Sequence, residues 1–383
     1  MNKIKPQFLE GSRAIASTIA NLDVDVISAY PITPQTHIVE DLALFKAENK
    51  ANYEFIKAES EFAAASILVG ASAAGGRTYS ATSSQGVLLM MEVLYNAAGL
   101  RLPIVMTIAN RSVSAPINIF NDHSDAIAMK DSGWLMLFAE NHQEAVNLHI
   151  LAYKLAEQLE LPVAVNVDGF IITHSHESVS IPNRKIIKSF LPSYRPAPYT
   201  YLDSKKPITL GGFFSPKHYS EARQELSEDI QKAQALITKE HRAWQKIFPQ
   251  AEKKAHCFND GLIEYCGPSK PGKILVAMGS VCGTIKEVLK KNTKVGLIKI
   301  ISFRPLPIKS LNKIIPGSCQ LAILEKSAPL STFGTLYTEI ISSLANFKGT
   351  ASNHIIGLGG EDVSEEMIQK IINLNNKKVI KFW

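Results

Sequence analysis

One glutamate is the residue best suited to chemistry in this sequence. Glu61 closes the run Glu59-Ser60-Glu61, which precedes an alanine-rich stretch that extends to Gly75-Gly76. Acidic and hydroxyl side chains satisfy the free N–H groups at a helix start, so we expect a helix to begin here. Many of the side chains that follow are small, which lets backbones approach closely. The alternative, and the commoner role of a lone first-turn glutamate, is an ordinary capping charge.

Other polar groups follow predicted strands. Arg111 comes directly after the apolar run Pro103 to Asn110, and its planar guanidinium is suited to a carboxylate. An ordinary surface ion pair is the alternative. Thr33 stands between two prolines, where a plain turn hydroxyl is the alternative. The run Asp122-His123-Ser124-Asp125 offers only one imidazole among turn-forming residues, so we expect no metal site there.

The stretch from residue 59 to 99 must position Glu61, and its pattern predicts helix, strand, turn and helix. Thr78 to Ala81 is the expected strand, followed by a hydroxyl-rich turn that ends at Gly86. From Val87 to Ala98 only Glu92 and Asn96 are strongly polar. We therefore expect the second helix to be buried nearly all round, between two domains or two chains.

Continuous apolar strands alternate with helices throughout residues 23 to 168, which indicates a parallel sheet covered on both faces. Ligands of such sheets lie beyond the carboxyl ends of the strands. This rule places Thr33, Ser83-Ser84-Gln85 and Arg111 along one crevice. We expect strands at 23–30, 55–58, 78–81, 103–110, 134–139 and 162–167, and helices at 35–47 and 143–159.

The rest of the chain predicts an extended arm, a long helix, a linker and a second α/β unit. Residues 189 to 216 are rich in proline and tyrosine without periodicity, Glu221 to Trp244 is a polar helical pattern, and Phe248 to Asp260 is the expected linker. The fold class is therefore α/β, with domains at 1–250 and 258–383. The second should be smaller, with four or five parallel strands at 273–278, 295–300, 321–324 and 354–357, and helices at 284–291, 308–315, 335–344 and 365–373.

Composition excludes several classes. The chain has 383 residues, 46% hydrophobic and 20% charged, with a formal net charge of +6. It has no basic arm with interleaved aromatics, so nucleic acid is not expected as a partner. Residues 270 to 326 carry ten Lys plus Arg304 against two Glu, which we interpret as a solvated face, with a docking face for an anionic partner as the alternative. No apolar segment is long enough to span a membrane, so we do not expect a membrane as a partner.

The cysteines are few and give no metal-binding pattern. Cys257, Cys266, Cys282 and Cys319 form no CxxC pair, so we expect neither zinc nor an iron–sulfur cluster within this chain. Scattered cysteines and the lack of an apolar signal core predict a reducing, cytoplasmic location.

Taken together, these motifs resemble one family. The sequence is similar over essentially its whole length to the alpha subunit of the multi-subunit pyruvate:ferredoxin oxidoreductases, also called pyruvate synthases, within the 2-oxoacid:ferredoxin oxidoreductases. The resemblance implies a parallel-sheet thiamine-diphosphate-binding fold, here the pyrimidine-binding domain, followed by a transketolase-C-terminal-like domain. The motifs that carry it, in order, are Tyr30-Pro31-Ile32-Thr33-Pro34-Gln35-Thr36, Glu59-Ser60-Glu61, Ala81-Thr82-Ser83-Ser84-Gln85-Gly86, Ala109-Asn110-Arg111, Asn121-Asp122-His123-Ser124-Asp125 and Asp168-Gly169-Phe170.

The resemblance also implies the chemistry and its division among subunits. Thiamine diphosphate would be shared with a partner, and magnesium and the iron–sulfur clusters would lie on partners, because this chain lacks the glycine–aspartate–glycine signature of the diphosphate site. Coenzyme A is the implied co-substrate and ferredoxin the electron acceptor. The implied partners are beta, gamma and delta-type subunits.

Individual residues match the family's functional positions. Glu61 matches the glutamate that hydrogen-bonds a pyrimidine nitrogen of the cofactor and favours its imino tautomer. Arg111 matches the arginine that pairs with the substrate carboxylate, and Thr33 matches the threonine near the reacting carbonyl. No metal ligand is implied in this chain. Tyr30, Pro31, Ser84 and Gln85 join Glu61 as implied cofactor-binding residues.

Two departures and two alternatives stay open. Glu325-Lys326 stands where the family commonly has Asp-Arg, and Gly359-Gly360-Glu361-Asp362 where Gly-Gly-Arg-Asp is common, which puts contacts of the second domain in doubt. A branched-chain or other 2-oxoacid enzyme is the first alternative function. A non-catalytic assembly subunit with the same fold is the second.

Overall fold

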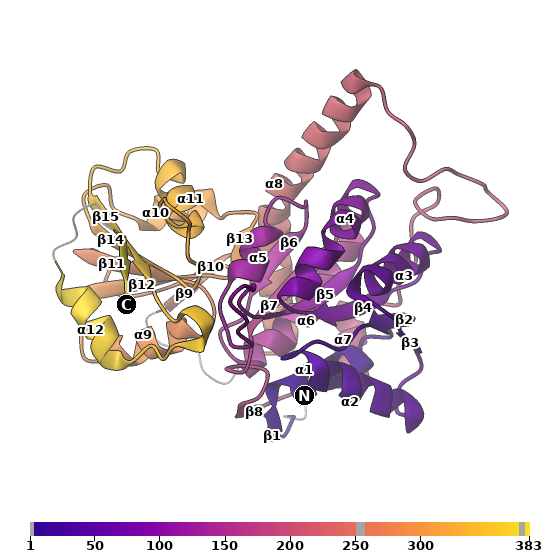
Figure 1. Ribbon diagram of the computed structural model, residues 1–383, viewed down its shortest axis with the longest axis horizontal. Helices are drawn as coiled ribbons and strands as arrows, with labels where there is room; N and C mark the ends of the chain where they lie inside the picture. Colours follow the sequence, from indigo (N-terminus) through magenta and orange to yellow (C-terminus); the bar gives the residue numbers. More distant parts are fainter. Residues whose placement is uncertain (1–3, 250–256, 375–379) are drawn as a thin grey trace.

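The structure, a computed structural model, describes residues 4–249, 257–374 and 380–383. It contains two seven-stranded sheets, each covered by helices on both faces, and a small two-stranded sheet (Figure 1). The predicted α/β class with parallel strands is confirmed. The small sheet pairs β1 (Gln7–Glu10) with β8 (His176–Val179).

The first sheet places the candidate site residues along one edge. Its strand order is β13-β6-β7-β5-β4-β2-β3, and all neighbours are parallel except β13, which pairs antiparallel with β6. The side chains alternate between two cores, as Val105 and Met106 of β5 show. The strands are β2 (Val26–Ala29), β3 (Glu54–Lys57), β4 (Thr78–Thr82), β5 (Val105–Asn110), β6 (Leu135–Phe138), β7 (Val163–Asp168) and β13 (Ser302–Arg304).

Different helices cover the two faces of this sheet. One face packs against α1, α2 and α6, with α7 and α8 behind α6, and the other packs against α3, α4 and α5. Apolar residues recur on the inner side of each helix, which explains why they fold onto the sheet. The helices are α1 (Gly11–Ala20), α2 (Thr36–Ala47), α3 (Glu61–Ala73), α4 (Gln85–Gly99), α5 (Ser124–Ala128), α6 (His142–Leu159), α7 (Arg184–Phe190) and α8 (Pro216–Ile247).

The prediction that α4 is buried nearly all round is wrong for the chain by itself. Leu88, Leu89 and Tyr95 are 39%, 50% and 41% exposed. Their side chains lie on the outer face of α4, where this chain offers no element to cover them in its described part. The apolar sequence of α4 therefore indicated a face that avoids water, but it did not show whether this chain or another chain covers that face.

The second sheet has the order β16-β15-β14-β11-β12-β10-β9. The five strands from β16 to β12 are parallel, as expected, whereas the antiparallel hairpin β9–β10 was not predicted because its strands are short and half-exposed. Helices α9 and α12 cover one face, and α10 and α11 the other. The elements are β9 (Cys257–Asn259), β10 (Ile263–Cys266), β11 (Lys273–Ala277), α9 (Val281–Leu289), β12 (Val295–Ile300), α10 (Ile308–Ile314), β14 (Gln320–Glu325), α11 (Thr335–Ser343), β15 (Thr350–Ile355), η1 (Leu358–Gly360), α12 (Glu365–Asn373) and β16 (Ile380–Phe382).

The two sheets do not divide the chain at one point. Strand β13 follows β12 in sequence yet lies in the first sheet beside β6. The expected linker, Phe248 to Asp260, falls largely outside the described residues, and its last part forms β9. The boundary between 250 and 258 therefore stays a prediction.

The segment from residue 191 to 215 projects from the body before α8 returns (Figure 1). Apart from an isolated bridge between Asp203 and Lys206, it contains no strand or helix, in keeping with the predicted arm. Phe213, near its end, is fully exposed. Helix α8 begins five residues before the predicted polar helix.

The basic stretch from 270 to 326 is not one solvated face. Lys273 is buried and donates to the carbonyl oxygens of Ile372 and Leu374, each at 2.6 Å. Lys299 is buried among carboxylates, with Glu140 at 2.7 Å and Glu144 at 2.9 Å. The interpretation failed because charge counting cannot see carboxylates that the fold brings from the first sheet.

Two of the cysteines are joined. Cys257 and Cys266 lie opposite each other on β9 and β10 and form a disulfide. Their separation of nine residues hid this pairing, because the hairpin itself was not predicted. Cys282 and Cys319 are free and buried. Among the described helices, none is long and apolar enough to cross a membrane.

Candidate functional site

Glu61 begins α3 at the carboxyl edge of the first sheet. Ser60 caps the helix, since its side-chain oxygen accepts a hydrogen bond from Ala63 N at 3.1 Å. Ser60 is therefore the N-cap residue, and Glu61 is the acidic residue of the first turn. Its side chain is turned inward, and the residue is only 7% exposed. Among the described residues, no hydrogen-bond donor reaches the Glu61 carboxylate, so its oxygens are available to a ligand.

Gly86, in the first turn of α4, forms the wall opposite Glu61. A Cβ at this position would lie 2.9 Å from Oε1 of Glu61 and 2.3 Å from Oγ1 of Thr82. No side chain fits there without displacing both groups. Gly86 therefore allows the start of α4 to approach the carboxylate closely.

The turn between β4 and α4 is held in an unusual conformation. Ser84 has φ = +49°, a region that a non-glycine residue adopts only when its surroundings require it. Its N–H donates to Oδ2 of Asp125 at 2.9 Å, and its hydroxyl donates to the carbonyl oxygen of Ser112 at 2.5 Å. Gln85 donates from Nε2 to the hydroxyl of Ser114. The turn is thus tied to the loop that follows β5.

Arg111 and Thr33 are brought together as the strand-end rule predicts. Nη1 of Arg111 donates to the carbonyl oxygen of Thr33 at 2.9 Å, and Nε donates to that of Asn118 at 3.0 Å. The residue is 8% exposed. Within the described part of the chain, Nη2 makes no hydrogen bond. The guanidinium is therefore fixed by two backbone carbonyls and keeps one nitrogen for a ligand.

The loop before α2 carries the remaining predicted residues. Tyr30 is 38% exposed, Pro31 is partly buried, and Thr33 is exposed. Gln35 braces the loop by donating from Nε2 to the carbonyl oxygen of Tyr30 at 2.8 Å. Tyr30 and Thr33 are thus the exposed members of the predicted set, whereas Glu61, Ser84 and Arg111 are buried.

Asp125 organises this region, although the sequence assigned no task to it beyond its place in a family motif. The residue is fully buried, and its Oδ2 accepts the N–H groups of Ser84 and Arg111, at 2.9 and 3.0 Å. Oδ1 accepts from the side chain of Asn110 at 3.0 Å. Burial raises the pKa of Asp125 to about 6, against the effect of these donors. The only sequence signal was an aspartate near a strand end, which turns also produce.

Several buried polar atoms near this edge have no partner among the described residues. Unpaired buried hydroxyls are uncommon in native proteins, and several at one strand edge are typical of a site that a ligand completes. Oγ1 of Thr82 is the clearest, because it lies beside Gly86 and the Glu61 carboxylate. The unpartnered atoms of this group are Oγ of Ser28, Oε1 of Gln35, Oγ of Ser80, Oγ1 of Thr82 and Oγ of Ser83.

The second domain closes one end of the strand edge. Asp168, at the end of β7, is 1% exposed and contacts Lys326 Nζ at 2.8 Å and His123 Nε2 at 2.8 Å. Ser280 also donates its N–H to Asp168, at 3.1 Å. Burial alone would raise the pKa of Asp168, but Lys326 and His123 hold it well below its usual range.

The two departures from the family pattern have different surroundings. Glu325 is 3% exposed and accepts the N–H groups of Leu336 and Tyr337 at the start of α11, at 2.8 and 3.0 Å. Burial raises its pKa to about 7. Glu325 and Lys326 thus make contacts within this chain, whereas Glu361 is exposed.

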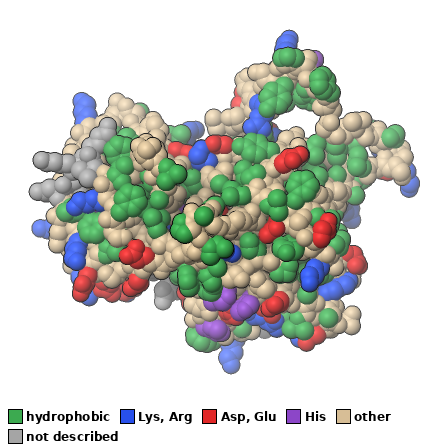
Figure 2. All heavy atoms as spheres, in the orientation of Figure 1, with side chains coloured by type: hydrophobic (Ala, Val, Ile, Leu, Met, Phe, Trp, Pro, Cys, Tyr) green, Lys and Arg blue, Asp and Glu red, His purple; other side chains and the backbone are tan. Residues whose placement is uncertain are grey.

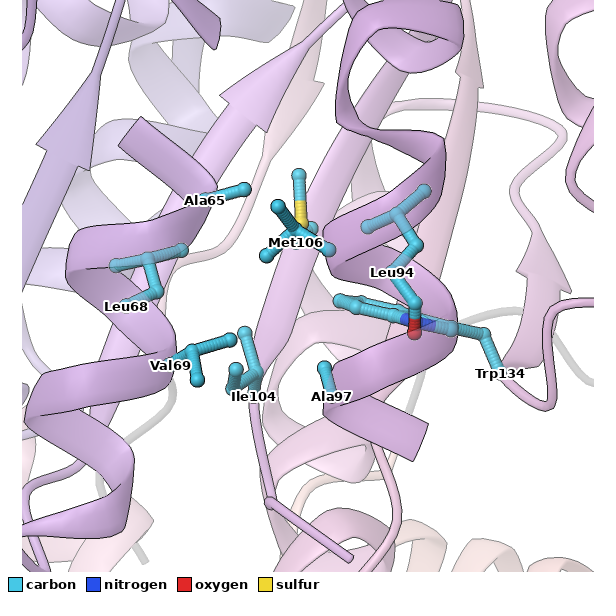
Figure 3. A pocket seen from close by; sticks show the side chains of 9 residues that line it. Ala65, Leu68, Val69, Leu94, Ala97, Ile104, Met106 and Trp134 are labelled. Carbon is cyan, nitrogen blue, oxygen red and sulfur yellow. The ribbon is translucent and has the colours of Figure 1, made fainter. Parts of the chain in front are cut away.

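Two hollows lie near α3 and α4, and neither is lined by the predicted site residues. An apolar cavity of about 10 Å³ lies between the two helices, lined by residues such as Leu68, Met106 and Trp134 (Figure 3). Its lining is almost wholly apolar, so it is a dry packing gap. A larger groove of about 380 Å³ lies on the outer face, between Phe62 of α3, Asn96 of α4 and Leu210 of the arm. Hydrophobic side chains are spread over this face (Figure 2).

Fold and site define a class: an α/β protein whose parallel sheet presents an unpaired buried carboxylate, an anchored arginine and a glycine cradle at its carboxyl edge. Residues 17–242 match the family described as "Pyruvate flavodoxin/ferredoxin oxidoreductase, thiamine diP-bdg". Residues 272–368 match "Pyruvate:ferredoxin oxidoreductase core domain II". The chain belongs to the pyruvate:ferredoxin oxidoreductase family and corresponds to its alpha subunit, an oxidoreductase subunit.

The curated relatives agree over nearly the whole chain. Pyruvate synthase subunit PorA of Methanocaldococcus jannaschii is 43% identical over 95% of this chain and 93% of its own length. The protein of the same name from Methanosarcina barkeri is 42% identical over 97% and 93%. Ketoisovalerate oxidoreductase subunit VorA of Pyrococcus abyssi is 34% identical over 100% and 96%.

A solved structure shares the fold. The 2-oxoglutarate:ferredoxin oxidoreductase from Magnetococcus marinus, with 2-oxoglutarate, coenzyme A and succinyl-CoA bound, superposes with a TM-score of 0.72 at 17% identity. The match covers 97% of this chain, which spans 65% of the length of that protein.

Proposed function

We propose that this subunit holds the pyrimidine half of thiamine diphosphate and orients pyruvate for oxidative decarboxylation to acetyl-CoA and CO2, or for the reverse synthesis. Coenzyme A would accept the acyl group, and the electrons would pass to ferredoxin. The observation that carries the proposal is the Glu61 carboxylate, which is buried, without a donor among the described residues, and faces the Gly86 cradle.

The residues present fit this cofactor. Glu61 offers an acceptor for a ring N–H, the unpartnered Thr82 hydroxyl lies beside it, and Gly86 lets the start of α4 pack closely against both groups. Ser84 and Gln85 would form the floor of the pocket, and Tyr30 and Pro31 its outer rim. When bound, thiamine diphosphate supplies the nucleophilic carbon that attacks the 2-oxo group.

Each residue of this chain then has a defined task. Glu61 holds a proton at its carboxylate, and burial keeps water from competing for it. Arg111 uses its free Nη2 on the substrate carboxylate, since Nε and Nη1 are already fixed on carbonyl groups. The Thr33 hydroxyl hydrogen-bonds the substrate near its reacting carbonyl. Asp125 positions Ser84 and Arg111 through their backbone N–H groups.

The other half of the site would come from partners. The exposed apolar face of α3 and α4, with its groove and the adjoining arm, is the surface that we propose a beta-type subunit covers. Thiamine diphosphate would be shared across this contact. Magnesium, the iron–sulfur clusters and the ferredoxin contact would lie on the beta, gamma and delta-type subunits, with the assembled enzyme in the cytoplasm.

Reconstitution tests the proposal. The chain combined with beta, gamma and delta-type subunits should oxidise pyruvate with coenzyme A and reduce ferredoxin. The chain alone should be inactive, bind thiamine diphosphate weakly and show no iron–sulfur absorbance. Comparison with 2-oxoisovalerate and 2-oxoglutarate addresses the second candidate, a branched-chain enzyme, which the 34% identity to VorA supports. Tight cofactor binding by the isolated chain would contradict the shared site.

A further inference from the structure

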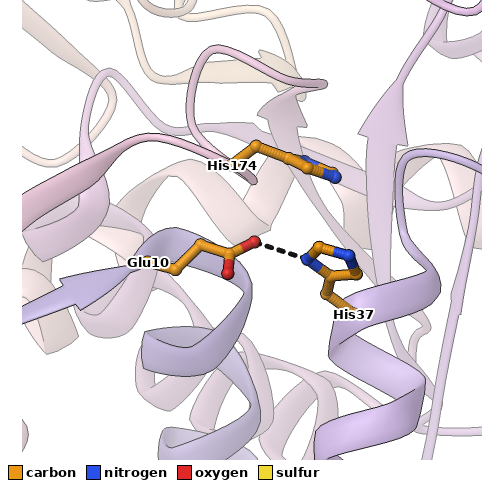
Figure 4. Close-up of side chains that lie close together, drawn as sticks. All are labelled: Glu10, His37 and His174. Carbon is orange, nitrogen blue, oxygen red and sulfur yellow. Dashed lines mark hydrogen bonds and ion pairs between the residues drawn. The ribbon is translucent and has the colours of Figure 1, made fainter.

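A second group of ligand-type side chains lies on the opposite side of the loop that carries Thr33. It consists of Glu10 at the end of β1, His37 in the first turn of α2 and His174 in the turn after β7 (Figure 4). Their ligand atoms all lie within 4.8 Å of one another. Figure 2 shows histidines gathered with carboxylates at the lower edge of the molecule.

The two imidazoles are oriented by neighbours. Oε1 of Glu10 contacts Nδ1 of His37 at 2.7 Å, and the hydroxyl of Thr173 contacts Nδ1 of His174 at 2.7 Å. The Thr173 contact leaves Nε2 of His174 for a metal ion, whereas the Glu10 carboxylate and Nδ1 of His37 lie side by side as two ligand atoms. The rings lie 4.6 Å apart between centroids, at an angle of 36°. For His174, a hydroxyl on one ring nitrogen with the other nitrogen free is the arrangement that metal-ligating histidines show.

We propose that Glu10, His37 and His174 bind one divalent transition-metal ion of the Zn²⁺ type. Two imidazoles and one carboxylate form a recognised three-residue zinc ligand set, which leaves a fourth position for water. Bonds of about 2.0–2.2 Å require the ligand atoms to lie about 3.4 Å apart, so the ion would take the place of the 2.7 Å hydrogen bond between Glu10 and His37. His37 is exposed, with 47% of its side chain accessible, which gives the ion a path from solvent.

The ion would join three segments next to the candidate active site. His37 follows the Thr33-Pro34 turn by three residues, and His174 closes the turn that begins at Gly169. These two turns already touch, since a Cβ on Gly169 would lie 2.6 Å from Cγ of Pro34. A metal at this place therefore acts as a clamp that fixes the Thr33 loop against the end of β7. It takes no part in the reaction itself.

Metal titration of the full-length chain tests the assignment. All proteins carry Cys257→Ser, because Cys257, Glu264 and Cys266 form the other ligand-type group among the described residues. After chelator treatment, Zn²⁺ binding is measured by calorimetry, and Co²⁺ binding by its visible absorption. We expect one ion per chain, without a thiolate charge-transfer band, and a higher melting temperature with the ion bound.

Variants locate the site. His37→Gln and His174→Gln should each weaken Zn²⁺ binding by at least about 100-fold, the upper end of what loss of an outer-shell partner costs. Glu10→Gln should weaken it by about 10- to 100-fold. His218→Gln, on the distant α8, is the matched control and should bind like the parent. Circular dichroism of the metal-free proteins checks that each variant is folded.

Two results would overturn the proposal. One is the lack of Zn²⁺ binding by the parent at millimolar concentrations, which would leave Glu10 and His37 as a plain ion pair. The other is equal binding by the parent and both histidine variants, which would place the ion elsewhere. Because the readout is binding and melting, it is independent of whether the chain turns over pyruvate.

Discussion

Two buried aspartates at the same edge of the first sheet are stabilised in opposite ways. Asp125 meets neutral donors, the N–H groups of Ser84 and Arg111 and the Asn110 amide, and burial raises its pKa to about 6. Asp168 meets Lys326 and His123, which lower its pKa despite equally complete burial. One carboxylate is surrounded by amides and the other by cations.

The difference separates the half of the edge where we propose that ligands bind from the half where the two sheets are joined by ion pairs. At the domain contact, carboxylates of the first sheet pair with lysines of the second, as Glu140 also does with Lys286 and Lys299. At the candidate site, neither Asp125 nor Glu61 forms an ion pair among the described side chains, although Asp125 interacts electrostatically with the Arg111 guanidinium. Burying a carboxylate without an ion pair is costly, and carboxylates with a shifted pKa, as Asp125 has, cluster at functional sites.

Removing the proton-holding carboxylate should give the largest effect. Glu61→Gln keeps a hydrogen-bonding group but cannot hold and release a proton, so turnover of the reconstituted complex should fall by about 10²- to 10⁴-fold. Ser60 supplies the helix cap, so the melting temperature should not change. Hydrogen–deuterium exchange at the thiazolium carbon, measured beside the melting temperature, reports the two properties separately.

The matched control is Glu59→Gln, which removes an exposed charge two residues earlier. It should leave exchange and melting like the wild type. Wild-type exchange in Glu61→Gln with a lowered melting temperature would mean that Glu61 is only a stabilising charge.

Breaking the domain contact should affect stability instead. Lys326→Met leaves His123 as the only cationic partner of buried Asp168 among the described side chains, and loss of one member of a buried ion pair costs about 3–5 kcal/mol. Lys309→Met, at an exposed lysine, should change the free energy of unfolding little. Urea unfolding of the full chain measures both.

A double variant sharpens this result. Asp168→Asn with Lys326→Met removes both charges, so it should cost less than the sum of the single changes. Because the pKa of Asp168 is lowered on folding, its contribution to stability is present above about pH 4, the usual range of an unfolded aspartate, and is lost as the pH falls further. Strict additivity would show that the two groups do not interact.

The sequence predicted those features of the sheet edge that depend on local residue patterns. Continuous apolar runs indicated the parallel strands, and the shared edge of their carboxyl ends placed Thr33 beside Arg111. The tasks of Asp125 and Lys326 could not be predicted. Lys326 and Asp168 are 158 residues apart, and their pairing exists only once the two sheets are in place.

Two other failures have related causes. Strand β13 has only three residues, too few for a periodic signal, so its transfer to the first sheet was missed. The apolar outer face of α4 was expected to be buried, yet in this chain Leu89 is half exposed. Hydrophobicity shows that a surface avoids water, but it does not show whether the cover belongs to the same chain.

Replacing the planar guanidinium of Arg111 should lower kcat/KM by an intermediate amount. Arg111→Lys keeps the charge but cannot hold the Thr33 and Asn118 carbonyls and still reach a substrate carboxylate. Loss of a charged hydrogen bond of about 1.5–3 kcal/mol predicts a fall of about 10- to 150-fold in kcat/KM for pyruvate. Steady-state kinetics of the reconstituted complex measure it.

Arg101→Lys is the control, because Arg101 pairs with Asp229 at a partly exposed site away from the sheet edge. It should leave kcat/KM unchanged. Wild-type kinetics in Arg111→Lys would remove Arg111 from the substrate site.

The smallest expected effect is a pH dependence that originates at Asp125. Only the ionised carboxylate can accept all of its N–H donors, so kcat/KM should fall as the pH drops through about 6. At pH 5, a group with a pKa of about 6 is only about one-tenth ionised, which predicts a loss of roughly tenfold from this group. The free energy of unfolding should rise, not fall, as the pH drops over this range. The folded state binds the proton more tightly than the unfolded state, so this group stabilises the fold as the pH falls from about 6 to about 4.

Asp125→Asn should lower kcat/KM at neutral pH and also flatten the acid limb, because an amide does not titrate and places an NH2 group against N–H donors. Asp131→Asn, at an exposed aspartate shortly after α5, should keep the wild-type profile. If Asp125→Asn retained the acid limb, another group would be responsible. Asp125 would then differ from Asp168 in its packing but would have no titration that affects catalysis.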